Sequence, residues 1–178
     1  NPDNYKLQVF TKEDGLQGNQ FLTLVHDKGK SGKIYFGGQN GVNHFYPQKI
    51  KVSDFVPRVA FTSFKIFNKE VPVNKLFTTD KSSKEQIFLT KDINYTDKII
   101  LSYKENVFSI QFAALDYAAP DDIKFAYKLE GANDSWIETT ADNRTLSYTN
   151  LPAGEYVIQV RSTNADGIWC NNIRKLGI

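Results

Sequence analysis

Apolar and polar residues alternate along most of the C-terminal two-thirds of the chain. The clearest case is the segment 123–129, where every second residue is apolar: Ile123, Phe125, Tyr127 and Leu129. Residues 99–103, 108–112 and 156–160 repeat the pattern. A period of two places alternate side chains on opposite faces of a strand. The pattern therefore predicts antiparallel strands with one face on a core and the other toward water.

Polar and glycine-containing segments separate these apolar runs. They occupy residues 121–122, 130–134, 141–143, 152–154 and 166–167. Short strands with turn signals at this spacing are typical of a β-sandwich. No segment of the chain shows the period of an α-helix, so we expect an all-β fold.

One turn in the C-terminal part predicts a specific local structure. Tyr156 opens an alternating segment directly after the turn Leu151 to Gly154. A tyrosine in this position matches the tyrosine corner of Ig-like sandwiches, in which the ring packs in the core and the hydroxyl bonds to the preceding backbone. Ile158 stands where antibody domains have their second cysteine, so we expect an apolar core without that disulfide.

The first fifty residues predict a different unit. Strands are expected over 21–26, 33–36 and 42–45, joined by glycine-bearing turns into a three-stranded meander. We expect the meander to leave an unpaired apolar face made of Phe21, Leu24, Tyr35, Phe36, Val42 and Phe45. A single small sheet buries little, and such units become stable when they repeat radially, as in a β-propeller. The expected domains are a partial blade at 1–50, a linker at 51–56 and a sandwich at 57–178.

Composition narrows the classes of function. The chain has 178 residues, of which 40% are apolar, and a formal net charge of +2. So small a charge argues against nucleic acid as the main partner. No apolar run approaches the roughly 18 residues of a membrane span. The chain begins at Asn1 and contains no methionine, so we expect it to be a piece of a longer protein. A lone cysteine, Cys170, excludes an internal disulfide.

Residues with catalytic or metal-binding chemistry form no convincing site. His26 and His44 lie in expected strands without an acid–base partner at a telling spacing. The glycine-rich segment 37–41 joins strand to strand, whereas a phosphate-binding loop needs a helix N-terminus behind it. The polar segment 27–32 lacks the alternate carboxylates of a calcium loop. We therefore expect no catalytic residue, no metal and no cofactor.

Three aromatic residues leave a choice between binding and packing. Trp136 and Trp169 follow polar segments, and Tyr117 lies in one. Exposed aromatic rings can stack on the apolar faces of sugars, so Trp136 and Tyr117 are candidate ligand contacts. The alternative is that each tryptophan fills one end of the sandwich core, and we favour it.

The C-terminal motifs resemble a known family. The segments 127–131, 148–156 and 160–169, with Trp136 between the first two, are similar to the three-tyrosine (Y_Y_Y) domain. The name refers to tyrosines that match Tyr127, Tyr148 and Tyr156, and the resemblance adds Trp136, Gly154 and Trp169 as structural signature residues. In the N-terminal part, segments 13–20 and 34–45 resemble the closing repeat of a two-component-regulator propeller.

This resemblance implies a non-catalytic role. Such domains form the periplasmic sensor of membrane-bound histidine kinases, many of them hybrid regulators of polysaccharide use in Bacteroidetes. It implies a periplasmic portion of an inner-membrane protein, with its own propeller and kinase as partners and possibly an oligosaccharide. A homodimer is expected as well, and the exposed meander face gives a second reason for self-association. Because the chain stops at Ile178, we expect membrane attachment only through a missing downstream helix.

A different class of function stays open at this point. The sandwich could be a carbohydrate-binding module, with Trp136, Trp169 and Tyr117 at a ligand surface. It could also be an accessory domain of a polysaccharide-degrading enzyme, since a sandwich fold alone does not select a function.

Overall fold

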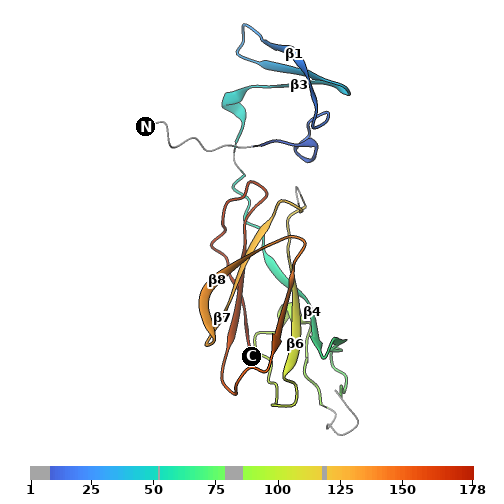
Figure 1. The fold of residues 1–178 in the computed structure, drawn as a ribbon, viewed down its shortest axis with the longest axis vertical. Helices are drawn as coiled ribbons and strands as arrows, with labels where there is room; N and C mark the ends of the chain where they lie inside the picture. Colours follow the sequence, from blue (N-terminus) through green and yellow to red (C-terminus); the bar gives the residue numbers. More distant parts are fainter. Residues whose placement is uncertain (1–8, 52, 79–85, 118–119) are drawn as a thin grey trace. The chain divides into compact units, whose positions relative to one another are not determined.

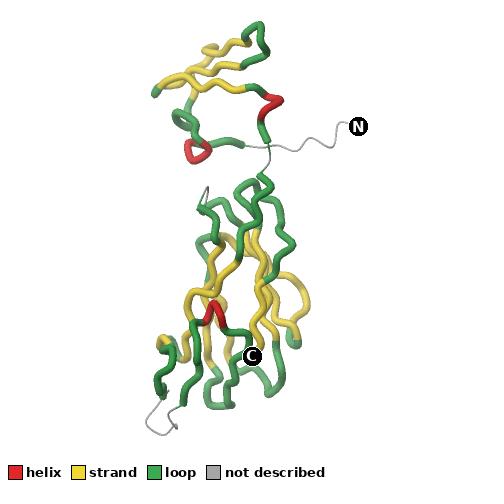
Figure 2. Tube along the Cα trace, turned by 180° about the vertical axis from the view of Figure 1, so that it is seen from behind, coloured by secondary structure: helices red, strands yellow, loops and turns green. Residues whose placement is uncertain are grey.

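Three antiparallel sheets account for the regular structure of the described residues, apart from a few short 3₁₀ helices. The computed structural model describes residues 9–51, 53–78, 86–117 and 120–178. Within these residues there is no α-helix (Figure 2), and the 3₁₀ helices are η2 (Lys12–Asp14), η3 (Pro47–Lys49) and η4 (Ile93–Tyr95). No helix in this part of the chain is long and apolar enough to cross a membrane. The all-β class expected from the alternating pattern is confirmed.

The chain divides into two compact units, Asn1–Ser53 and Asp54–Ile178. The first contains one sheet of the strands β1 (Phe21–Lys28), β2 (Ile34–Gly38) and β3 (Gly41–Phe45), in that order. Glycines at the β2–β3 turn allow the tight connection, because Gly41 has a φ of +137° that a side chain rarely tolerates. The meander expected from the sequence is present in this order.

The expected single apolar face of this meander is wrong in part. Phe36 pairs with Asn43 and Tyr35 pairs with His44, so Tyr35 and Phe36 point to opposite faces. Rings of Phe21, Phe36 and Phe45 gather on one face, with centroids about 6 Å apart. The register places Tyr35 and Val42 on the other face, and Leu24 lies in an irregular stretch of β1 with a φ of +64°.

The second unit consists of two four-stranded sheets (Figure 1). One has the order β11-β10-β7-β8 and the other β5-β4-β6-β9. Their bounds are β4 (Val59–Ile66), β5 (Lys69–Glu70), β6 (Val107–Ala114), β7 (Lys124–Glu130), β8 (Asn133–Thr140), β9 (Thr145–Thr149), β10 (Val157–Ser162) and β11 (Arg174–Gly177). Because β8 and β9 are consecutive but lie in different sheets, the short turn between them crosses from one layer to the other.

The inward faces of the two sheets share one hydrophobic core. Phe112 of β6 meets Phe125 of β7 edge-on across the layers, with ring centroids 5.0 Å apart. Ile158 and Val160 of the central strand β10 are completely buried. Each such side chain contributes about 1.5–3 kcal/mol through burial. The alternating positions over 123–129, 108–112 and 156–160 supply this core, as the sequence pattern predicts.

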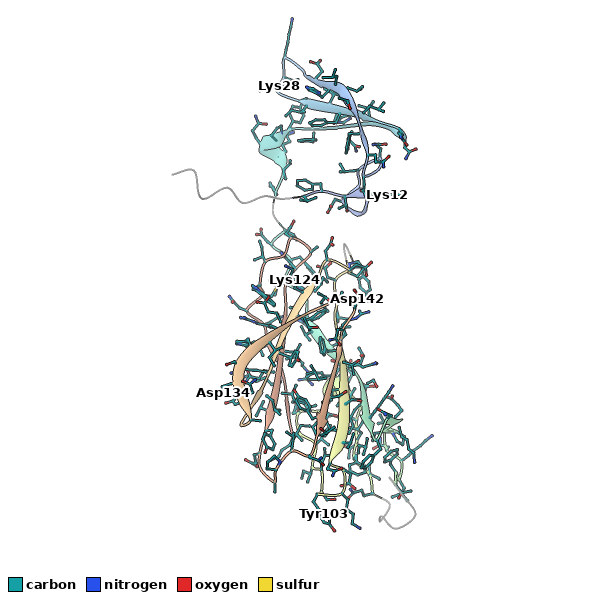
Figure 3. All side chains as sticks on the ribbon, viewed as in Figure 1. Lys12, Lys28, Tyr103, Lys124, Asp134 and Asp142 are labelled. Atoms are coloured by element: carbon teal, nitrogen blue, oxygen red, sulfur yellow. The ribbon has the colours of Figure 1, made fainter. Side chains whose placement is uncertain are left out.

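The segment 99–103 is an exception, since it is not a strand. Ile99 is buried and its amide donates to the carbonyl oxygen of Gly177 at 2.9 Å, but Tyr103 is 84% exposed at one end of the unit (Figure 3). Glu105 provides the reason. Its buried carboxylate accepts hydrogen bonds from the backbone amide of Ser102 at 2.9 Å and from the hydroxyl of Ser102, which ties residues 102–105 into a turn. This local bonding competes with an extended conformation.

Candidate interaction site

Tyr156 anchors the turn that leads into β10. Its hydroxyl donates to the carbonyl oxygen of Pro152 at 2.9 Å, and its side chain is 9% exposed. The backbone amide of Tyr156 donates to the carbonyl of Ile178, and the amide of Ile178 returns the bond. The hydrogen bond of a tyrosine corner, expected from the sequence, is therefore present.

Two glycines make room for this ring. A Cβ atom on Gly154 would lie 3.3 Å from the Tyr156 hydroxyl. A Cβ atom on Gly131 would lie 2.9 Å from the carbonyl oxygen of Glu155, and Gly131 has a φ of +95°. Larger residues would push the tyrosine or its backbone out of place, so the expected signature residue Gly154 has a packing reason.

Tyr127 and Tyr148 border a second feature, a cavity between the edges of the two sheets. The cavity holds about 280 Å³ and is lined by β7, β8 and β9 residues that include Tyr127, Ile137, Leu146 and Tyr148. The ring of Tyr148 packs against Phe108 at 5.4 Å between centroids. Its hydroxyl is shielded from water and has no hydrogen-bond partner among the described residues.

The environment of Tyr148 opposes ionisation. Burial, together with the negative charge that Tyr127 would carry when ionised, raises the pKa of Tyr148 to about 12. A phenol with so high a pKa stays neutral throughout the physiological range and cannot act as a base there. This pair of tyrosines is therefore a packing feature of the core edge.

The outer face of the β11-β10-β7-β8 sheet carries the most unusual group of side chains in the unit. The guanidinium carbon of Arg161 lies 4.5 Å from the ring centroid of Trp136 and 4.8 Å from that of Trp169. The ammonium of Lys128 lies 5.5 Å from the Trp136 centroid. We call these four residues, Lys128, Trp136, Arg161 and Trp169, the Trp–Arg ladder.

Strand register brings the ladder together. Arg161 of β10 pairs with Ala126 of β7, and Ala126 pairs with Glu138 of β8. Since Trp136 lies two residues before Glu138, it shares the outer face with Arg161. Ala126 is completely buried even though it faces outward, so larger neighbouring side chains cover its small one. Trp169 joins from the segment after β10, through a bridge with Thr163.

The two tryptophans do not fill the ends of the core, so the packing role favoured from the sequence is wrong. Both are half-buried, and neither belongs to the core cluster. The alternation along β8 explains why Trp136 lies outside the core, because its neighbour Ile137 takes the inward position. Tyr117, the other candidate ligand contact, is 89% exposed and makes no ring contact with either tryptophan among the described residues.

The remaining candidates form no reactive cluster. His26 packs beside Phe36 and His44 beside Tyr35, with ring centroids 6.2 and 5.8 Å apart. Burial raises the pKa of the Cys170 thiol, and the negative charge of Asp116 adds to this. Across the described ranges, no three histidine, cysteine or carboxylate side chains are placed to hold a metal ion.

Arg161 and Lys128 are the members of the ladder that sequence reasoning did not single out. Their types are ordinary for a solvent-facing strand position, so composition and motif searches pass over them. A usable signal was available in the alternation, which assigns Lys128 to the outward face of its strand. The contact between strands β8 and β10 across β7 depends on register, which the sequence pattern alone does not specify.

Comparison with known proteins identifies the C-terminal part of this fold. Residues 116–178 match the Y_Y_Y domain. All three tyrosines on which the resemblance rests lie inside this Y_Y_Y stretch, as do all four residues of the ladder. The resemblance stated from the sequence is confirmed here.

Relatives and solved structures match a longer stretch than the Y_Y_Y domain alone. A protein named Histidine kinase P4 from Formosa agariphila is 30% identical over 95% of this chain, which covers 12% of that protein. The extracellular domain of a protein described as a hybrid two-component system, BT3049 of B. thetaiotaomicron, aligns with a TM-score of 0.67 and 24% identity over 95% of this chain and 21% of its own. A similar domain, from BT4673, aligns with a TM-score of 0.55 and 25% identity over 84% of this chain and 18% of its own. The chain thus spans a small part of the proteins it matches.

Proposed function

We propose that this chain is a segment of the extracytoplasmic region of a hybrid two-component sensor histidine kinase, in the periplasm, and that it performs no catalysis itself. The observation that carries the proposal is the similarity over 95% of the chain to a histidine kinase of which it covers 12%. A short stretch of a long sensor needs no reactive site of its own. Two buried polar groups of the described residues, the carboxylate of Glu105 and the hydroxyl of Tyr156, are used in turns.

The two units suggest a domain assignment within this sensor. We assign residues 57–178 to an Ig-like, fibronectin-like sandwich, residues 51–56 to a linker and residues 1–50 to a partial propeller blade. The tyrosine corner at Tyr156 supports the first assignment. The apolar face of the N-terminal sheet supports the last, because the described part of its own unit leaves a cavity of about 480 Å³ between Phe21, Phe36 and Ile50.

The sandwich would relay a ligand-driven rearrangement toward the kinase. Its two sheets share a continuous core in which Phe61, Phe64 and Phe112 are almost fully buried. Closely packed cores resist deformation, so a displacement at one end of such a body is passed to the other. This stiffness is the property that a relay between a sensor and a kinase requires.

A test of the relay uses the whole protein in membranes. Phe112→Leu leaves a cavity beside Phe125, where the two sheets pack together. It should therefore change the basal rate of histidine autophosphorylation per molecule of folded protein. The matched control is Tyr103→Leu, which alters an exposed ring and should leave that rate unchanged. Autophosphorylation that is absent from the whole protein would reject the kinase assignment. Equal rates in the wild type and Phe112→Leu would reject the relay alone.

Self-association is a second part of the proposal. Phe21 and Val42 are 40% and 64% exposed, and apolar surface with free strand edges favours pairing with a second copy. Light scattering after size exclusion should show a mass that rises toward the dimer with concentration. A strict monomer at the highest soluble concentration would contradict this.

A carbohydrate-binding module is the alternative function. The exposed ring of Tyr117 and the outward position of Trp136 favour it, since neither is used in the core. Binding of neutral oligosaccharides should then quench tryptophan fluorescence, and Trp136→Ala should abolish the quenching. No fluorescence change with neutral oligosaccharides would leave the relay as the function.

A further inference from the structure

Arg161 is a cation to which the described part of the chain offers no anion. Its guanidinium makes cation–π contacts with two rings, but it has neither a hydrogen bond nor an ion pair within the described ranges. The Nε atom is shielded from water and also lacks a partner. A guanidinium has five N–H donors, and leaving the shielded Nε–H of Arg161 unpaired is costly.

The neighbouring charges do not supply the missing partner. Glu130, on the same sheet face, accepts a hydrogen bond from Gln159. Glu138 lies in the same cross-strand row as Arg161 but forms no ion pair with it. Lys128 adds a second positive charge over the ring of Trp136. The ladder is therefore a positively charged patch with an aromatic lining.

The ring contacts of Arg161 also favour a particular kind of ligand group. Rings of tryptophan attract the flat faces of a guanidinium, whereas its N–H donors lie in the plane and point outward. Contacts with both rings hold the guanidinium of Arg161 beside the two indoles. A carboxylate matches the fork of a guanidinium with two parallel hydrogen bonds.

We propose that the Trp–Arg ladder binds an acidic oligosaccharide through the carboxylate of a uronate unit. The carboxylate would bond to Arg161, with Lys128 close enough to add attraction. The apolar C–H face of the sugar ring would lie along the indole rings of Trp136 and Trp169. This binding site goes beyond the relay proposed above, and neither depends on the other.

The chain contains its own reporter for the test. Its two tryptophans are both members of the ladder, so intrinsic tryptophan fluorescence reports on this site alone. Oligogalacturonate should change the fluorescence saturably, and added salt should weaken the binding. Galactose oligosaccharides of the same length, which lack the carboxylate, should leave the fluorescence unchanged.

Three substitutions locate the effect. Arg161→Met should weaken binding roughly tenfold or more, because charge-assisted hydrogen bonds are lost. Lys128→Met should weaken it less. Lys175→Met is the matched control, since it removes a positive charge from the same sheet face in β11, opposite Gln159 and outside the ladder, and it should bind like the wild type. If Arg161→Met does not fold by circular dichroism, the comparison of Lys128→Met with Lys175→Met decides.

Three results would overturn the proposal. The first is no fluorescence response to oligogalacturonate. The second is equal binding by the Lys128 and Lys175 variants. The third is a response to polyglutamate as strong as that to oligogalacturonate, which would identify an acidic protein segment as the partner. None of these outcomes bears on autophosphorylation or on the effect of Phe112→Leu, so failure of this binding proposal is distinguishable from failure of the relay.

Discussion

The phenolic oxygen of Tyr156 lies 2.9 Å from the carbonyl oxygen of Pro152, which fastens the start of β10 to the turn before it. Tyr156→Phe keeps the ring and removes only this hydrogen bond. We expect the free energy of unfolding to fall by about 1 kcal/mol, the usual net value of one such bond. Urea unfolding followed by circular dichroism measures the change.

Tyr103→Phe is the control for that experiment. Tyr103 is 84% exposed, so removing its hydroxyl should leave the unfolding free energy within about 0.5 kcal/mol of the wild type. If both variants were as stable as the wild type, the corner hydrogen bond would have no energetic role.

Tyr148→Phe should have the opposite effect to Tyr156→Phe at neutral pH. The Tyr148 hydroxyl is shielded from water and has no partner among the described residues, and an unpaired buried polar group costs stability. Its ring contact with Phe108 would be retained in the variant. We expect the free energy of unfolding to stay equal or rise by up to about 1 kcal/mol. A clear loss of stability would reveal a hydrogen bond that the structure does not contain.

The same tyrosine predicts a loss of stability in alkaline solution. Burial raises the pKa of Tyr148 from its ordinary value of about 10 to about 12. Between these two values the unfolded chain releases a proton that the folded protein keeps, so the free energy of unfolding falls as pH rises. Partial exposure of the side chain limits the loss to about 2 kcal/mol or less.

Urea unfolding of the wild type and of Tyr148→Phe, repeated from about pH 9 to about pH 12, tests this window. The variant should lose less stability across it than the wild type. Parallel curves for the two proteins would show that Tyr148 is not the group responsible.

The inward-facing pattern could be predicted from the sequence because burial itself imposes it. Ile158 and Val160 face the core at every second position of β10. The turn at Pro152 could be predicted as well, because the residue types from Leu151 to Gly154 themselves indicate a turn. The positions of the tryptophans could not be predicted in this way. Trp136 contacts Arg161 across an intervening strand, and such a contact depends on the register of three strands rather than on any local motif.

Glycine at position 131 should be required for two separable reasons. Gly131 has a φ of +95° and no room for a Cβ atom, whereas Gly167 has a φ of +73° and open space around it. Gly167→Ala should cost about 1–2 kcal/mol from the left-handed conformation alone. Gly131→Ala should cost more, because its Cβ atom would also meet the carbonyl oxygen of Glu155. Equal losses in urea unfolding would show that the clash is relieved elsewhere.

In the segment 99–103, which was expected to be a strand and is a loop, two adjacent isoleucines differ in burial. Ile99 is 1% exposed and belongs to the core, while Ile100 is 79% exposed. Ile99→Ala should lower the free energy of unfolding by about 2–5 kcal/mol, since it opens a cavity in the core. Ile100→Ala should change it by no more than about 0.5 kcal/mol.

Urea unfolding of the two isoleucine variants side by side distinguishes the observed loop from a regular strand. A strand on the edge of the core would bury Leu101 as deeply as Ile99, so Leu101→Ala is the informative third variant. In the observed loop Leu101 is only half-buried and lines the cavity beside Tyr156 and Ile178. Its truncation should therefore cost clearly less than that of Ile99, because the space it leaves already opens to water. Equal costs for the two would mean that the segment pairs as the alternation alone suggests.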